Sequence, residues 1–150
     1  VRDASNNWSQ QAKLTASDGA ANDYFGTSVS LTTDTALIGA PSTFSGGPQG
    51  AAYIYVRDSN NIWTQQAKLT AHDGNIGDNF GNSVSLLDDT ALIGAYKDDD
   101  NGLQSGSAYV FVRDTNGNWT QQAKIKASDG EANDNFGWNV ALTGTTALLS

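Results

Sequence analysis

Apolar and polar residues alternate over short stretches of this chain, and the same stretches occur in three copies. In residues 80–87 large side chains alternate with small ones, which predicts a strand with one buried face. Residues 90–95 (TALIGA) are apolar on both faces, as in a strand that is covered on both sides. Residues 51–58 alternate aromatic with small or branched side chains, and residues 63–69 are largely polar. Each copy therefore predicts four short strands, ordered from apolar to polar.

The connections and the edge residues agree with this prediction. Only two residues, 88–89, separate the first two strands of the second copy, so these strands form a tight hairpin. No stretch shows the 3.6-residue apolar period of an amphipathic helix. Lys13, Lys68 and Lys124 occupy equivalent places in the polar fourth strand. Lysine suits an outer strand because it discourages pairing with other sheets.

The period of the repeat predicts the architecture. Trp8, Trp63 and Trp119 are separated by 55 and 56 residues, and the chain holds about 2.7 copies of the unit. A single four-stranded unit of this size cannot cover its own apolar faces, so neighbouring units must cover them. The sequence therefore predicts an all-β fold, a β-propeller of four-stranded antiparallel blades with repeats of about 55 residues.

Composition narrows the function classes. The chain has 16 acidic and 8 basic residues and a net charge of −8, which argues against nucleic acid and anionic membrane surfaces as partners. No apolar run approaches the roughly 18 residues of a spanning helix, so membrane insertion is not expected. Cysteine is absent and His72 is the only histidine, which nearly excludes the usual nucleophile–base pairs. We expect no enzymatic activity.

The pairs that begin and end the apolar strands point to a family. Phe25-Gly26 followed by Gly39-Ala40-Pro41 resembles the FG-GAP repeat of integrin α-subunit propellers and their bacterial relatives. The second copy departs from the motif at Tyr96, where the first has proline. The resemblance implies that the Phe-Gly pair opens the innermost strand of each blade.

The same resemblance implies the domain organisation. The blades are expected at about residues 25–69 and 80–126. Residues 1–14 would supply the end of a third strand and an outer strand, and residues 136–150 the two inner strands of another blade. The two terminal pieces are then complementary half-blades.

Two kinds of acidic cluster are candidate metal sites. The resemblance implies a calcium loop between the first two strands, but the two-residue turns here are too short to wrap the ion. A second motif, S/H-D-G followed by a second Asp before Phe-Gly, recurs between blades. It forms either a ring of metal or ligand carboxylates or a set of structural turns, and the structural role is favoured. No cofactor is expected, with calcium at these carboxylates as the alternative. The residues are Asp18, Asp23, Asp73, Asp78, Asp129 and Asp134.

Binding residues are expected in the loops that differ between copies. Loops 41–50 and 96–106 vary on an otherwise constant scaffold, as where a rim is diversified for ligand contacts. The acidic run in the second loop is either a weak cation site or a solvated tip. The aromatic residue in the first is either an exposed anchor or packed under its own loop. The repeated tryptophans favour packing between blades over sugar stacking. The candidate ligand-binding residues are Phe44, Asp98, Asp99, Asp100 and Asn101.

Two functions follow from the resemblance. The first is a non-catalytic binding or adhesion module, secreted or at the cell surface, whose rim loops contact a protein or glycan ligand. The alternative is a structural subunit whose terminal half-blades pair between chains to complete a propeller, oligomer or filament. In either case the partners completing the ring are further copies of the chain or the rest of a longer polypeptide.

Overall fold

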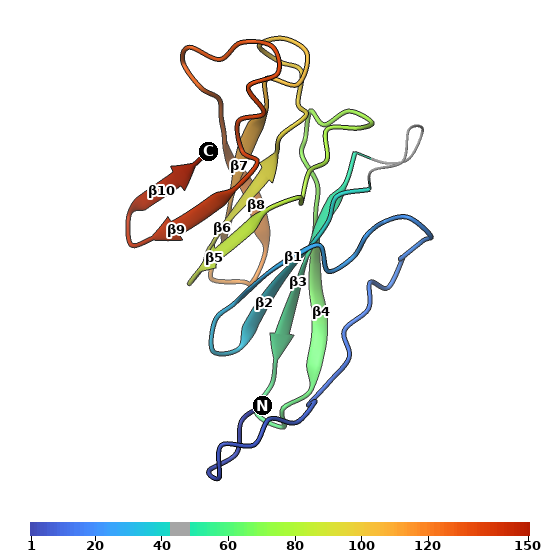
Figure 1. Cartoon of the computed structure of the whole chain (residues 1–150). Coiled ribbons are helices and arrows are strands. Elements are labelled where there is room, and N and C mark those ends of the chain that lie inside the picture. Colours follow the sequence, from blue (N-terminus) through green and yellow to red (C-terminus); the bar gives the residue numbers. More distant parts are fainter. Residues whose placement is uncertain (43–48) are drawn as a thin grey trace.

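The computed structural model describes residues 1–42 and 49–150, and within them all regular structure is β-strand. Two four-stranded antiparallel sheets stand side by side and are followed by a two-stranded sheet (Figure 1). We call them the first blade, the second blade and the half-blade. Among the described residues no helix has the length and apolar character needed to cross a membrane. The strands are β1 (Ser28–Leu31), β2 (Thr35–Ala40), β3 (Ala51–Arg57), β4 (Trp63–Leu69), β5 (Val84–Leu87), β6 (Thr90–Ala95), β7 (Ser107–Arg113), β8 (Trp119–Ile125), β9 (Val140–Thr143) and β10 (Thr146–Leu149).

Burial follows the predicted order of polarity. β2 is buried along its whole length, and β6 is buried from its second residue onward, because each lies between two strands of its sheet and is covered on both faces. β4 alternates half-buried and exposed residues, as an outer strand does. The order within each blade, β1-β2-β3-β4 and β5-β6-β7-β8, makes the chain a partial β-propeller and confirms the predicted fold class.

The innermost strand is shorter than predicted. The sequence predicts a strand over 80–87, but β5 begins at Val84. Asn79 and Gly81 have φ angles of 58° and 94°, in the left-handed region that interrupts a strand. The Asn82 N–H donates to the Asn79 carbonyl at 3.1 Å and closes a turn there. The turn places Phe80, fully buried, over the aromatic residues of β7 instead of in the sheet.

The two blades pack face to face, and the innermost strand β5 lies within their contact. Val84 and Leu86 of β5 are 8 % and 7 % exposed between the blades, whereas Val29 and Leu31, at the same places in β1, are each 68 % exposed. The Ser28 hydroxyl donates to the Gly81 carbonyl at 2.9 Å across this junction. The apolar core therefore lies between the sheets, as expected for units that cover one another.

The two terminal segments differ from each other. Residues 136–150 form β9 and β10, which pair with each other. Residues 1–14 contain only an isolated bridge between Arg2 and Trp8. In the described part of the chain they form no strand of any sheet. The outer strand predicted there is not among the strands of the described residues, the first of which is β1.

Candidate functional site

Each complete blade carries a lysine–tyrosine–aspartate contact at its rim. In the second blade Lys124 Nζ lies 2.8 Å from Asp73 Oδ2, and the Tyr109 hydroxyl donates to Asp73 Oδ1 at 3.1 Å. The first blade repeats the contact with Lys68, Tyr53 and Asp18. The first Asp of the interblade motif thus ties the loop that enters a blade to the outer strands of that blade.

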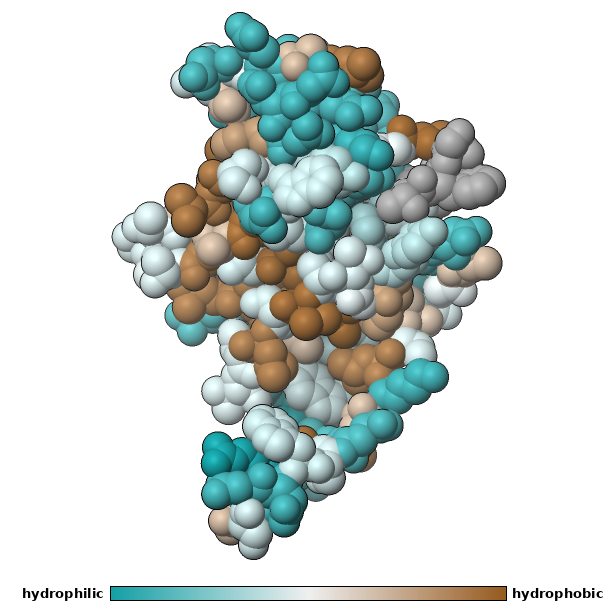
Figure 2. All heavy atoms as spheres, in the orientation of Figure 1, coloured by the Kyte–Doolittle hydropathy of each residue, from teal (hydrophilic) through white to brown (hydrophobic). Residues whose placement is uncertain are grey.

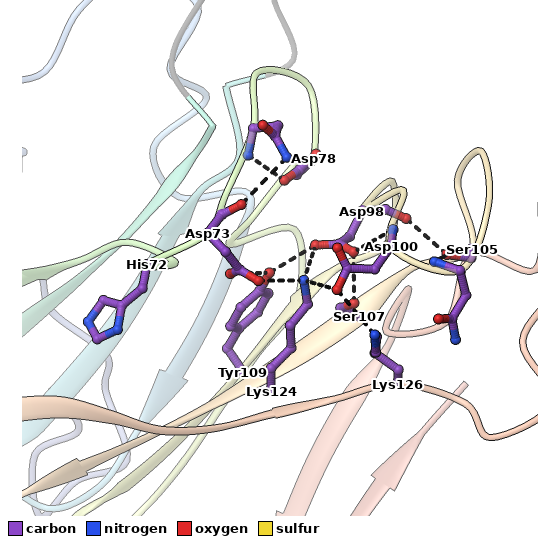
Figure 3. Close-up of polar contacts among 12 residues, drawn as sticks. His72, Asp73, Asp78, Asp98, Asp100, Ser105, Ser107, Tyr109, Lys124 and Lys126 are labelled. Carbon is purple, nitrogen blue, oxygen red and sulfur yellow. Dashed lines mark hydrogen bonds and ion pairs between the residues drawn. The ribbon is translucent and has the colours of Figure 1, made fainter.

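The second blade adds two carboxylates to this contact. Lys124 Nζ also lies 2.8 Å from Asp98 Oδ2 and 2.8 Å from Asp100 Oδ2, both in loop 96–106 (Figure 3). The Lys124 side chain is 13 % exposed and Asp98 is 2 % exposed. Asp100 also pairs with Lys126 at 3.3 Å. A single ammonium group thus joins the blade, the interblade loop and the rim loop.

The charges in this cluster stabilise one another. Burial alone would lower the pKa of Lys124, but hydrogen bonds to Asp100, Asp73 and Asp98 outweigh it and raise that pKa. The hydrogen bond from Lys124 lowers the pKa of the Asp100 carboxyl. Burial raises the pKa of the Tyr109 hydroxyl, so it stays a proton donor. At neutral pH Lys124 is therefore positively charged and Asp100 negatively charged, beside a neutral Tyr109 phenol.

Asp98 is a structural residue of the rim loop. Its Oδ1 accepts the Asp100 N–H at 3.1 Å and the Ser107 hydroxyl at 3.0 Å, and its Oδ2 accepts the Tyr109 hydroxyl at 2.9 Å. With the Lys124 ammonium these bonds satisfy both carboxylate oxygens inside the protein. The prediction that Asp98 contacts a ligand conflicts with this burial, because nothing reaches a side chain that is 2 % exposed.

The other predicted ligand residues lie at different places on the rim. Asp99 is exposed, and its Oδ1 accepts the Gln104 N–H at 2.7 Å. Asp100 and Asn101 are exposed, but the first is held by lysines and the second donates to the Ala127 carbonyl at 3.3 Å. Phe44 lies outside the described residues. Asp99 is thus the acidic residue of this loop that is most available to a partner.

The second Asp of the interblade motif closes a turn in all three copies. Asp23, Asp78 and Asp134 each accept, through Oδ2, the backbone N–H of the residue three positions earlier, at 2.6–2.7 Å. This geometry is the one the structural interpretation predicts. In residues 1–42 and 49–150 no three acidic, histidine or cysteine side chains are grouped so that they could hold a metal ion.

A hollow of about 190 Å³ opens on the rim of the second blade, between its entering loop and loop 96–106. Ile76 and Leu103 line it and are 63 % and 61 % exposed. Sequence reasoning missed both residues. A signal was present for Ile76, because the other two copies have Ala21 and Ala132 in its place. The polar part of the lining comes from Asp78, Lys97, Asp99 and Gln104.

Two of the three repeated tryptophans contact the preceding copy of the repeat, whereas Trp8 is 78 % exposed. Trp63 Nε1–H donates to Gln11 Oε1 at 3.1 Å, and Trp119 Nε1–H donates to Gln66 Oε1 at 3.0 Å. Both indoles therefore contact the polar segment of the preceding copy, as the packing interpretation predicts. His72 is exposed and points away from the lysine cluster (Figure 3).

Asp78 gives the rim a pH-dependent stability. Burial, with Asp98 and Asp99 nearby, raises the pKa of its carboxyl from 3.8 to about 6. The folded state then holds this proton more tightly than the unfolded state, so the stabilisation is complete below about pH 3.8 and is lost as pH rises through 6. We expect about 2 kcal/mol less stability at pH 7 than at pH 4.5 from this group. Urea unfolding across this range should show the slope, and Asp78→Asn should remove it.

The matched control for that measurement is Asp23→Asn. It makes the same change in the equivalent turn of the first blade, where the side chain is only partly buried. The Asn side chain keeps an oxygen for the backbone N–H in both variants. Equal slopes in the parent chain and Asp78→Asn would contradict the assignment to Asp78.

The blades and their rim loops show which class of protein this is. Four-stranded blades that cover one another, with variable loops on one rim, form part of a propeller scaffold. The FG-GAP repeat family matches residues 8–55, 63–111 and 119–150, and the chain belongs to this family. Membership indicates a binding module of the propeller type. A search of curated proteins found no match to the chain.

Proposed function

We propose that the chain is a non-catalytic binding module that recognises a protein partner through the rim of its second blade. The observation that carries the proposal is the pair of exposed aliphatic side chains, Ile76 and Leu103, beside a hollow of about 190 Å³. Large exposed apolar residues grouped in a concave, polar-rimmed place are typical of interaction sites. Adhesion, outside the cell or at its surface, is the role for which such a module is suited.

The comparison between copies supports this site. The three entering loops share their turn geometry, yet only the second has an aliphatic Ile-Gly pair where the others have Ala-Asn. The Ile-Gly pair leaves the turn intact and adds an exposed side chain, so its effect is on the surface that the loop offers to a partner. Leu103 lies in the loop that Lys124 holds in place through Asp98 and Asp100. The rim of the second blade is thus both specialised and preorganised.

The chemistry favours a peptide segment over a glycan. Two aliphatic groups accept an apolar side chain, and Asp99 with Lys97 offers charged groups at the edge of the same hollow. Sugars are more often held against aromatic faces, and the tryptophans at the equivalent strand positions contact neighbouring copies instead.

Selection of random peptides against the immobilised chain tests the proposal. We expect enriched peptides to carry an aliphatic residue and to bind Ile76→Asp and Leu103→Asp at least tenfold more weakly. Ala21→Asp, at the equivalent place in the first entering loop, is the matched control and should leave binding within twofold. Failure to enrich any peptide, or equal losses in all three variants, would contradict a rim site on the second blade.

A further inference from the structure

The rim loop of the first blade has no acidic residue to offer its lysine. Loop 41–50 contains neither aspartate nor glutamate, whereas loop 96–106 of the second blade contributes two carboxylates to Lys124. Lys68 holds the place of Lys124, and its side chain is 40 % exposed where that of Lys124 is 13 % exposed. Asp18 is its one ion-pair partner among the described residues. Because an ammonium group has several N–H donors, Lys68 has the capacity for a further carboxylate.

A cavity in the first blade lies where the second blade holds the Asp98 carboxylate. Side chains of β7 and β8 bind that carboxylate at 3.0, 2.9 and 2.8 Å, and they are Ser107, Tyr109 and Lys124. Their equivalents in β3 and β4 line a cavity of about 100 Å³, and they are Ala51, Tyr53 and Lys68. A cavity of this volume has room for a carboxylate with its methylene group.

A buried oxygen without a partner marks the same cavity. Gln49 lines it, and the Gln49 Oε1 atom is buried and accepts no hydrogen bond from the described residues. Ser105 holds the place of Gln49 in the second blade, since each directly precedes the glycine before the third strand. The Ser105 hydroxyl accepts the N–H of Asn101, in the acidic segment of loop 96–106, at 3.1 Å. A buried acceptor is destabilising until a donor reaches it, so Gln49 suits a backbone N–H that arrives with the carboxylate.

An aspartate in the lining is compatible with this occupant. Asp23 lines the cavity, and its Oδ2 accepts the Ala20 N–H at 2.7 Å. Asp78 holds the same place in the second blade, where burial and the nearby Asp98 raise its pKa. The second blade thus holds a carboxylate close to this turn, and the first blade has the same turn.

We propose that the rim of the first blade binds an aspartate side chain from an acidic segment of a partner protein. The carboxylate takes the place of Asp98, beside Tyr53 and Lys68, and a backbone N–H of the same segment donates to Gln49. In the surface view hydrophilic residues predominate over the loops at the top, and apolar residues gather over the sheets (Figure 2). A charged segment suits a rim of this kind. The cavity is separate from the hollow on the second blade, so the inference does not depend on the proposed function.

The test is a titration of the full chain with the peptide acetyl-Lys-Asp-Asp-Asp-Asn-amide, which has the sequence of residues 97–101. We expect saturable one-to-one binding, with changes in the amide NMR signals centred on Tyr53 and Lys68. Lys68→Met should weaken the peptide at least fivefold. Lys13→Met removes the same charge from the equivalent place in the first copy and should change affinity less than twofold. Ala51→Ser supplies the hydroxyl that Ser107 gives to Asp98, and it should tighten binding at least threefold.

Acetate alone distinguishes a peptide site from a site for small carboxylates. It has the carboxylate but no N–H for Gln49, so it should bind at least tenfold more weakly than the peptide. Gln49→Leu keeps a similar side-chain shape without the acceptor, and it should weaken the peptide at least threefold while acetate binding stays the same. The same peptide with asparagine in place of each aspartate should not bind.

Three outcomes would overturn the inference. One is no change in the signals of the first blade at millimolar peptide. Another is a loss in Lys13→Met as large as the loss in Lys68→Met, which reports general charge attraction. The third is equal affinity for acetate and the peptide, because it would assign the cavity to a free small carboxylate. Amide spectra of each variant without peptide confirm that the first blade stays folded.

Discussion

Replacement of Lys124 by methionine should destabilise the chain by about 3–5 kcal/mol. The ammonium group is the cation for Asp73, Asp98 and Asp100 at once, each at 2.8 Å. Methionine keeps most of the volume but leaves Asp98, which is 2 % exposed, as a buried and uncompensated charge. The free energy of unfolding in urea at pH 7 measures the loss.

The chain contains its own control for this experiment. Lys68 occupies the same place in the first blade, where Asp18 is its one ion-pair partner among the described residues and its side chain is 40 % exposed. An exposed pair of this kind contributes at most about 1 kcal/mol, so Lys68→Met should have a small effect. Adding Asp98→Asn to Lys124→Met should recover part of the stability, because a neutral amide replaces the stranded charge. Equal losses at the two lysines would contradict the central role of Lys124.

The architecture could be predicted because it depends on patterns that recur. Strand alternation, a period of about 55 residues and the Phe-Gly pairs each appear in more than one copy, so each copy tests the interpretation of the others. The contacts of Trp63 and Trp119 with the preceding copy could be predicted for the same reason, because tryptophan recurs at this position. The start of β5 did not, because the left-handed φ angles at Asn79 and Gly81 are a backbone property that alternation does not encode.

The site was harder to predict because it depends on what differs between copies. Asp98 belongs to a run of three aspartates, and the sequence does not show which of them turns inward. The choice follows from the reach of Lys124 and Tyr109 across the sheet. Similarly, Tyr96 and Trp138 are each unusual at their repeat positions, and only the structure shows their rings 4.2 Å apart between the second blade and the half-blade. A contact between two residues that each occur in one copy cannot be predicted by comparing the copies.

Replacement of Gly94 by alanine should destabilise the junction between the second blade and the half-blade by about 2–3 kcal/mol. A Cβ at Gly94 would lie 2.0 Å from the Gly137 carbonyl oxygen of the next copy, and one at Gly39 would lie 1.9 Å from that of Gly81. The obstacle is backbone in both places, so no rotamer change relieves it. Gly19→Ala, whose Cβ would meet its nearest neighbours at 3.4 Å, is the control and should be nearly neutral.

Amide exchange separates the local effect of Gly94→Ala from general destabilisation. Gly26 and Gly81, of the first two Phe-Gly pairs, donate their N–H to the carbonyls of Gly39 and Gly94 in the second strand of the same blade, each at 2.9 Å. The carbonyls of Gly81 and Gly137 lie against Gly39 and Gly94, which are the second-strand glycines of the preceding blade. The two glycines of the repeat therefore form a continuous backbone contact from blade to blade. Gly94→Ala should speed exchange in β9 and β10 while β1–β4 stay protected, and Gly39→Ala should act at the first junction instead. Uniform exchange throughout either variant would show that these glycines support single blades and not the contact between them.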